Sequence, residues 1–139
     1  MSFRRETDED GAVRLVGARC GYVYWRPRPG VVVMHVTGTD EGEFGTQPRD
    51  ELAEDLRLHA PIALFIELDD AAGARLPTQE AWSEWYSTHR SALRSVHVLT
   101  RTKYMNFTVE VVKLFSRTGD LIRVHVDEAP FVEELQRAA

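Results

Sequence analysis

Runs of apolar residues alternate with polar segments along the chain, and their spacing changes once, near Gly38. Before that point the apolar runs are short, rich in β-branched and aromatic residues and separated by brief connections, which is typical of strands. We expect three strands there, at Val13–Val16, Gly21–Trp25 and Val31–Thr37. Their connections are too short for a crossover, so neighbouring strands of this group must run antiparallel.

After Gly38, apolar runs alternate with segments whose apolar residues recur at helical spacing. The first predicted helix is Thr46–His59, with Thr46 as its N-cap, and the second begins at Pro77-Thr78. The third begins between Thr102 and Asn106 and ends at Phe115, and a short last helix is capped by Asp127. The predicted strands are Ile62–Leu68, Ser95–Thr100 and Leu121–Val126, and Asp69–Leu76 is predicted to be a loop. Strand–helix–strand crossovers make neighbouring strands parallel. The predicted fold class is therefore α/β, a mixed sheet with antiparallel N-terminal strands followed by parallel strand–helix crossovers and about four helices.

The length of 139 residues corresponds to one domain. We expect residues 1–10, which are mostly charged, to form a flexible tail, and residues 11–139 to form a single domain. No apolar run approaches the roughly 20 residues that cross a bilayer, so no transmembrane segment is expected. The single cysteine, Cys20, allows no disulfide within the chain, and we expect a cytoplasmic protein.

Charge and motifs argue against several classes of function. The chain carries 17 basic and 22 acidic side chains, and its net charge of −5 disfavours nucleic-acid binding, which requires clustered basic residues. Phosphate-binding glycine-rich motifs and the common hydrolase motifs are absent from the sequence. His97, His125 and Cys20 are the candidates for catalysis, but none has a visible partner. We therefore expect neither an enzyme nor a cofactor or metal, although histidines in strands could still meet in the fold.

The second predicted helix carries an aromatic cluster, Trp82, Trp85 and Tyr86, at spacings that place the three rings on one side. Packing in the core explains at least one of the two tryptophans. The others could line a ligand pocket or a dimer seam, where Trp and Tyr are enriched. Tyr104, Met105 and Phe107 could approach the same place from the start of the third helix, near the carboxyl ends of the parallel strands, where ligands of open α/β sheets bind. In the third helix we expect Phe107, Val111, Leu114 and Phe115 to face the core.

Acidic residues are concentrated in one segment of the chain. Residues 40–70 contain ten acidic and two basic side chains, a net charge of −8. The helical part of that segment offers an acidic face, formed by Asp50, Glu51, Glu54 and Asp55. Such a face either is simply solvated or meets a basic partner. A basic pole formed by Arg90, Arg94, Arg101 and Lys103 could pair with it in self-association.

The element order and several local sequences resemble the STAS domain and its SpoIIAA-like subfamily. The segments that carry this resemblance are Val36-Thr37-Gly38, Leu68-Asp69-Asp70, the aromatic run Ala81–Tyr86, Leu114–Gly119 and Ile122–Ala129. The resemblance implies a non-enzymatic protein of the anti-sigma-factor-antagonist kind, which binds a serine kinase or anti-sigma partner and is switched by phosphorylation at the start of its second helix. In the SpoIIAA-like subfamily that this chain resembles, relatives commonly lack the switch and pair as dimers. They have also been suggested to hold apolar ligands or to lie near membranes.

The chain departs from that pattern at the switch. The corresponding stretch, Asp69–Thr78, contains no serine, and Thr78 is its only hydroxyl residue. Thr78 is therefore either a phosphorylation site or simply a helix cap, and the switch is lost or has moved to Ser83 or Ser87. The function predicted from the sequence is a regulatory protein–protein interaction module without the usual phosphoserine switch. The alternative is a dimeric carrier or sensor of a small apolar ligand.

Overall fold

A computed structural model describes residues 2–138, which form a seven-stranded sheet flanked by helices. The strands are β1 (Arg4–Thr7), β2 (Val13–Val16), β3 (Cys20–Arg28), β4 (Val31–Asp40), β5 (Ile62–Ala74), β6 (Leu93–Leu99) and β7 (Ile122–His125). The helices are α1 (Gln47–Asp50), α2 (Ala53–His59), α3 (Leu76–Thr88), α4 (Lys103–Ser116) and α5 (Glu128–Arg137), with short 3₁₀ turns at η1 (Arg90–Ala92) and η2 (Gly119–Leu121). The strands lie in the sheet in the order in which they occur in the sequence.

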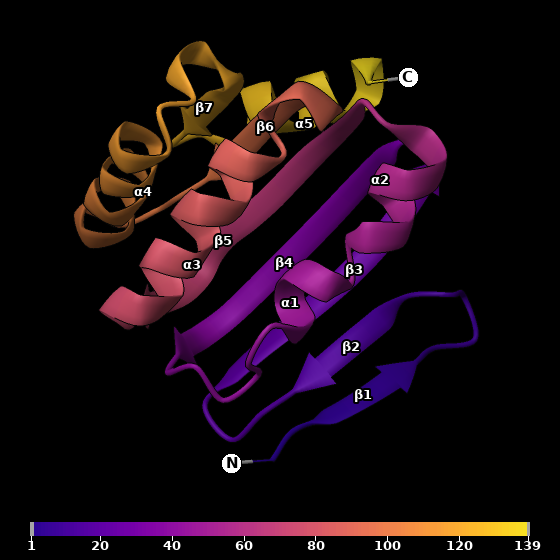
Figure 1. Cartoon of the computed structure of the whole chain (residues 1–139), viewed down its shortest axis with the longest axis vertical. Coiled ribbons are helices and arrows are strands. Elements are labelled where there is room, and N and C mark those ends of the chain that lie inside the picture. The colour runs from indigo at the N-terminus through magenta and orange to yellow at the C-terminus, as the bar shows by residue number, and fades with distance from the viewer. Residues whose placement is uncertain (1, 139) are drawn as a thin grey trace.

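The pairing of the strands changes direction at β4. The pairs β1–β2, β2–β3 and β3–β4 are antiparallel, whereas β4–β5, β5–β6 and β6–β7 are parallel. Each parallel pair is joined by a helical crossover, α1 and α2 in the first, α3 in the second and α4 in the third (Figure 1). The predicted mixed α/β fold class is confirmed.

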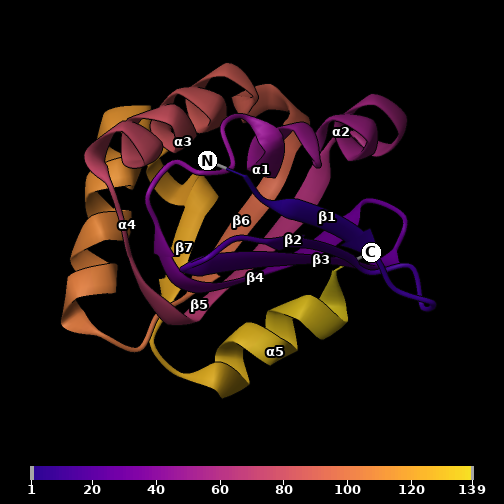
Figure 2. The ribbon, with the colours of Figure 1, turned by 90° about the horizontal axis from the view of Figure 1, so that it is seen from below.

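The helices cover the two faces of the sheet unequally (Figure 2). The three crossovers have the same hand, and each leads to the next strand on the same side of the sheet. Helices α1–α4 therefore lie on one face, and α5 alone lies on the other. The larger core, between the sheet and α1–α4, includes the fully buried Leu15, Tyr24 and Leu64. The smaller core, beneath α5, includes Phe65 and Phe131. No helix in residues 2–138 is long and apolar enough to cross a membrane.

Gly38 lies where the antiparallel part of the sheet meets the first crossover. Its φ is +75°, a conformation that residues with a side chain rarely adopt. A Cβ at this position would lie 1.9 Å from the carbonyl oxygen of Arg19, which accepts a hydrogen bond from the Thr39 N–H at 3.0 Å. A glycine is therefore required for the close approach of these two backbone segments.

The N-terminal residues differ from the sequence-based expectation. Arg4–Thr7, which the sequence analysis assigned to a flexible tail, form β1 and pair with Val13–Val16. All four side chains of β1 are exposed, so the strand has no apolar alternation that a sequence pattern could reveal. It is held by the backbone ladder and by an ion pair between Arg5 and Glu51.

Strand β5 is almost twice as long as predicted, because the expected loop at Asp69–Leu76 is wrong over most of its length. Residues up to Ala74 continue the strand and pair with β4 as far as Asp40. The ladder between β4 and β5 has irregular register after His35 and again after Gly38. The small, turn-favouring residues of this stretch give no strand pattern in the sequence. Pairing with the neighbouring strand β4 keeps the stretch extended.

Helix boundaries also differ from the prediction in detail. The predicted helix Thr46–His59 is divided into α1 and α2. Thr46 does not cap the backbone, because its hydroxyl donates to the Asp50 carboxylate at 2.8 Å, and Asp127 makes no side-chain cap to α5. Thr102 does cap α4, since its hydroxyl oxygen accepts from the Met105 N–H at 3.1 Å.

The buried face of α4 is not the predicted one. Met105, Thr108, Val109, Val112 and Ser116 are buried, whereas Phe107, Leu114 and Phe115 are exposed and Val111 is half-buried. The helix has two apolar stripes on nearly opposite sides, because Met105, Val109 and Val112 repeat the spacing of Phe107, Val111 and Leu114. Spacing alone does not distinguish the two stripes, and the bulkier one faces outward.

Candidate functional site

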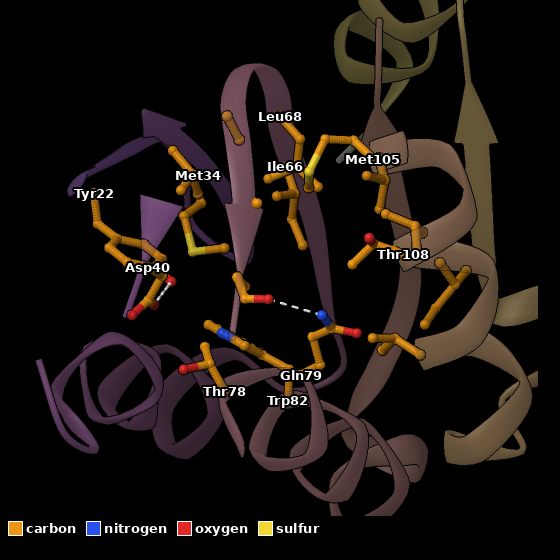
Figure 3. Close-up of a pocket in the computed structure, with 18 of the residues that line it drawn as sticks. Tyr22, Met34, Asp40, Ile66, Leu68, Thr78, Gln79, Trp82, Met105 and Thr108 are labelled. Atoms are coloured by element: carbon orange, nitrogen blue, oxygen red, sulfur yellow. Dashed lines mark hydrogen bonds between the residues drawn. The ribbon is translucent and has the colours of Figure 1, made fainter. Parts of the chain in front are cut away.

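An apolar cavity of about 100 Å³ lies between the sheet, α3 and α4 (Figure 3). It reaches the carboxyl ends of β4 and β5, the place where ligand sites of open α/β sheets are expected. The side chains that define its body are Met34, Ile66, Val98, Trp82, Tyr86 and Met105. The sequence analysis expected a pocket near the aromatic second helix, and this cavity lies beside that helix; its role as a binding site stays a prediction.

Of the six residues predicted to form a ligand or partner surface, three line this cavity. Trp82 and Tyr86 reach it from α3, and Met105 reaches it from α4. Trp85 is buried next to them, with its ring centroid 5.6 Å from that of Trp82, but it packs in the core outside the cavity.

The cavity wall includes a buried carboxylate, although nearly all of the cavity's surface is apolar. Asp40, at the end of β4, is only 4% exposed and accepts hydrogen bonds from the Tyr22 hydroxyl and, at 2.8 Å, from the Gly42 N–H. Burial, followed by the nearby Asp40 carboxylate and its hydrogen bond, raises the pKa of Tyr22 well above the usual value for a phenol. The Gln79 side-chain amide donates to the Ala74 carbonyl at 2.8 Å, near the labelled Thr78 and Trp82 in Figure 3. Tyr22 and Asp40 were not predicted as site residues, because they are 18 positions apart and meet only through strand pairing.

The other two predicted surface residues, Tyr104 and Phe107, belong to an exposed patch. We call the outward apolar side of α4 the α4 stripe; its members are Tyr104, Phe107, Val111, Leu114 and Phe115. Phe107 is 66% exposed and Phe115 is 73% exposed. Tyr104 lies over Gly73, where an added Cβ would come within 3.1 Å of its ring.

Thr78, the predicted phosphorylation candidate, lies in the first turn of α3 but does not cap it. The cap position is Arg75, and no side chain caps this helix. Thr78 is 9% exposed and lines the cavity near Gly42. The interpretation of Thr78 as a cap is therefore wrong. With so little exposed surface, its side chain is poorly accessible to a kinase in this structure.

The predicted acidic face is largely neutralised within the molecule. Glu51 pairs with Arg5, and Asp55 pairs with Arg26 at 2.8 Å. Burial opposes ionisation of Glu51, but hydrogen bonds from Arg5 and Gln47 outweigh it and lower the pKa of this carboxyl. The two remaining members of the face, which are exposed, also have partners: Glu54 pairs with Arg57 at 2.6 Å and Asp50 accepts from Thr46 at 2.8 Å.

Two histidines that the sequence left without partners meet beneath α5. Nδ1 of His97 on β6 lies 2.9 Å from Nε2 of His125 on β7, and their rings stack at 5.2 Å. His97 is 3% exposed, and burial followed by the charge of His125 lowers its pKa. The two residues are 28 positions apart, and only the register of adjacent parallel strands brings them together.

Three potential metal ligands lie close together, and one of them has a buried carboxylate oxygen, Asp69 Oδ1, without a hydrogen-bond partner. Ligand atoms of His35, Asp69 and Asp70 lie within 4.8 Å of one another, but His35 pairs with Asp70 at 3.1 Å and Asp69 with Arg101 at 3.5 Å. Burial, then the Asp40 and Glu43 charges, raises the pKa of Cys20 to about 12, so this thiol is not a ready nucleophile.

Solved structures show which fold this chain shares. No family model matches the sequence, and no curated protein matches it. Among solved structures, the chain is similar to an anti-sigma factor antagonist from Mycobacterium paratuberculosis, with a TM-score of 0.59 and 11% identity over 94% of this chain and 99% of that one. It is also similar to an uncharacterized protein of the DUF3478 family with a SpoIIAA-like fold from Shewanella loihica PV-4, with a TM-score of 0.57 and 14% identity over 84% of this chain and 94% of that one. The chain has a STAS/SpoIIAA-like fold.

Proposed function

We propose that the chain is a regulatory protein-interaction module that docks a partner on the α4 stripe and does not use the usual phosphoserine switch. The observation that carries this proposal is the α4 stripe itself, because it exposes four large apolar side chains on one helix. Contiguous apolar patches of this kind are uncommon on monomeric proteins and mark interaction sites. The likeness of the fold to that of an anti-sigma factor antagonist supports a binding role.

The surroundings of the stripe indicate the chemistry of the partner. Exposed Lys103 and Arg117 stand at the two ends of α4, and Arg90 donates to the Arg117 carbonyl at 3.0 Å. A partner that fits would therefore present an apolar groove or helix with an acidic border. Exposed aromatic side chains at the centre of such a contact carry much of the binding energy.

The test is capture from the source cells with the wild-type chain and with the double variant Phe107→Ser, Phe115→Ser, followed by titration of the purified partner. Because both rings are exposed, we expect the variant to keep its thermal stability and to bind the partner at least about tenfold more weakly. The matched control is Leu58→Ser, which removes an exposed apolar side chain from α2. Equal affinity of the double variant and the wild type would overturn the proposal. Light scattering shows whether the partner is a second copy of the chain.

A second candidate function, binding of a small apolar ligand, is favoured by the cavity. Cavities of roughly 150 Å³ lined by apolar side chains bind benzene or xenon in other proteins. This cavity, at about 100 Å³, is smaller, so it suits a short apolar chain or at most one small ring. Since Trp82 lines the cavity, its fluorescence reports occupancy. We expect toluene to change that emission in the wild type and not in Ala71→Leu, which fills part of the space. No change in the wild type would exclude this function.

A further inference from the structure

A histidine and two aspartates meet on the sheet, apart from both the cavity and the α4 stripe. We propose that His35, Asp69 and Asp70 bind a divalent transition-metal ion such as Zn²⁺. Ligand atoms of the three side chains lie within 4.8 Å of one another. The inference is independent of both candidate functions, because none of these residues lines the cavity or belongs to the α4 stripe.

The pairing of β4 with β5 brings the three side chains together. His35 on β4 is paired with Glu67 on β5, and the next pair along the ladder is Thr37 with Asp70. Strand β5 therefore has one residue more than β4 in this interval, which is a β-bulge. Successive side chains of a regular strand point to opposite faces, but a bulge re-aims one of them. The bulge accounts for two neighbouring aspartates that both reach the same histidine.

The spacing of the ligand atoms suits a shared ion. Nε2 of His35 lies 3.1 Å from Oδ2 of Asp70. Two ligand atoms that bind one Zn²⁺ at about 2.0 to 2.1 Å lie about 3 to 3.5 Å from each other. Rotation of the aspartate side chains can bring the third ligand atom to the same spacing.

The second ring nitrogen of His35 also has a suitable partner. Nδ1 lies 3.4 Å from Oε1 of Glu67, the residue paired with His35 across the two strands. Histidines that bind a metal commonly have a carboxylate at their other nitrogen, because it fixes the tautomer and the orientation of the ring. Glu67 therefore acts as a positioning residue, and Nε2 is the nitrogen that binds the ion.

The carboxylate of Asp69 is only partly satisfied by the protein. Its Oδ2 lies 3.5 Å from Nε of Arg101, a guanidinium that also pairs with Glu128 at 3.5 Å. Its Oδ1 is buried and accepts no hydrogen bond from residues 2–138. A buried carboxylate oxygen without a partner costs free energy, and a bound cation would remove that cost.

The ligand types select the class of ion. Imidazole nitrogen suits Zn²⁺ and other transition-metal ions, whereas Ca²⁺ and Mg²⁺ prefer oxygen ligands alone. One nitrogen and two carboxylates make three protein ligands, the number found in zinc sites that keep a position for water. The side chain of Asp70 is 63% exposed, so water can reach the ion from that side. We therefore expect Zn²⁺ to bind more tightly than Ca²⁺.

The experiment titrates the untagged full-length chain with ZnCl₂ and with CaCl₂ by calorimetry, and follows the nuclear magnetic resonance signals of the His35 ring. We expect Zn²⁺ to shift these signals and to bind at least about tenfold more tightly than Ca²⁺. His35→Gln removes the nitrogen ligand and should weaken Zn²⁺ binding at least about tenfold. The matched control is His59→Gln, which changes an exposed histidine of α2 and should leave the affinity unchanged.

A second pair of variants keeps the test decisive if His35→Gln does not fold. Asp70→Asn alters an exposed ligand and should also weaken Zn²⁺ binding, whereas Asp50→Asn alters an exposed carboxylate elsewhere and should not. Absence of Zn²⁺ binding by the wild type, or site variants that bind as tightly as the wild type, would overturn the inference. Equal weakening by the control variants would identify an adventitious surface ion only and would overturn it as well.

Discussion

At the scale of single residues, Gly38 controls the contact between the β2–β3 connection and the end of β4. We expect Gly38→Ala to lower the free energy of unfolding by more than about 2 kcal/mol, because the new methyl group meets the Arg19 carbonyl as well as an unfavourable φ. Gly11→Ala is the control: its φ is also positive, at +89°, but a Cβ there meets nothing within 4 Å. Urea denaturation measures both. Equal losses would mean that the close approach at Gly38 contributes nothing.

The histidine pair beneath α5 gives a pH dependence with a definite sign. The pKa of His97 is lowered in the folded chain, so as the pH falls through about 6.5 the unfolded chain takes up the proton first. Proton uptake by the unfolded state lowers the free energy of unfolding, and stability should therefore fall between pH 7 and pH 5.5. Among the other charges near His97, Glu134 acts against the shift and Arg123 adds to it.

Urea denaturation at several pH values checks this prediction. His97→Gln should give a shallower dependence of stability on pH over that interval than the wild type. His59→Gln, which changes an exposed histidine, should leave the slope as it is. A wild-type stability that is constant or rises towards pH 5.5 would be incompatible with a lowered pKa at His97.

At the scale of elements, α5 is held at both ends by contacts of different kinds. Phe131 is 1% exposed and meets Phe65 edge to face, with 5.7 Å between the ring centroids. Near the C-terminal end, the Arg28 guanidinium donates to the backbone carbonyls of Leu135 and, at 2.7 Å, Ala138. The first contact anchors the helix by apolar burial and the second satisfies carbonyls that the helix end leaves open.

We expect Phe131→Ala to lower the free energy of unfolding by about 3 to 5 kcal/mol, as other buried Phe-to-Ala changes do. Phe115→Ala removes the same atoms from the exposed α4 stripe and should change stability by less than about 0.5 kcal/mol. Thermal and chemical denaturation of the two variants provide the measurement. A small effect at Phe131 would show that α5 adds little to the stability of the sheet.

The positions of most elements could be predicted from the sequence, but the orientation of one helix could not. The existence and type of most elements followed from the apolar runs. Three of the predicted surface residues, Trp82, Tyr86 and Met105, line one cavity, but a binding role for them stays a prediction. The orientation of α4 could not be predicted, because two stripes of equal spacing compete and only the packing against α3 and the sheet decides between them. The hydrogen bond between Tyr22 and Asp40 could not be predicted for a related reason, since the two residues meet only through the pairing of β3 and β4.

At the scale of the whole molecule, burial is greatest in the middle of the sheet and falls towards its edges. The first half of β5 is buried on both faces, whereas every side chain of β1 is exposed. Amide hydrogens of Leu64 and Phe65 should therefore exchange only with global unfolding, and those of β1 should exchange fastest among the strands. Native-state hydrogen exchange tests this order. Protection of β1 equal to that of β5 would mean that the sheet opens as one unit.

The order of strands in the sheet has a consequence for how the chain reaches this structure. Because every strand pairs with its predecessor in the sequence, each can be added to the growing sheet soon after it leaves the ribosome. Helix α5 is fixed last, because the Arg28 side chain donates a hydrogen bond to the Ala138 carbonyl, 110 positions further along the chain. The apolar side chains beneath it stay uncovered until translation reaches that helix, so this face is where a nascent chain would need protection from aggregation.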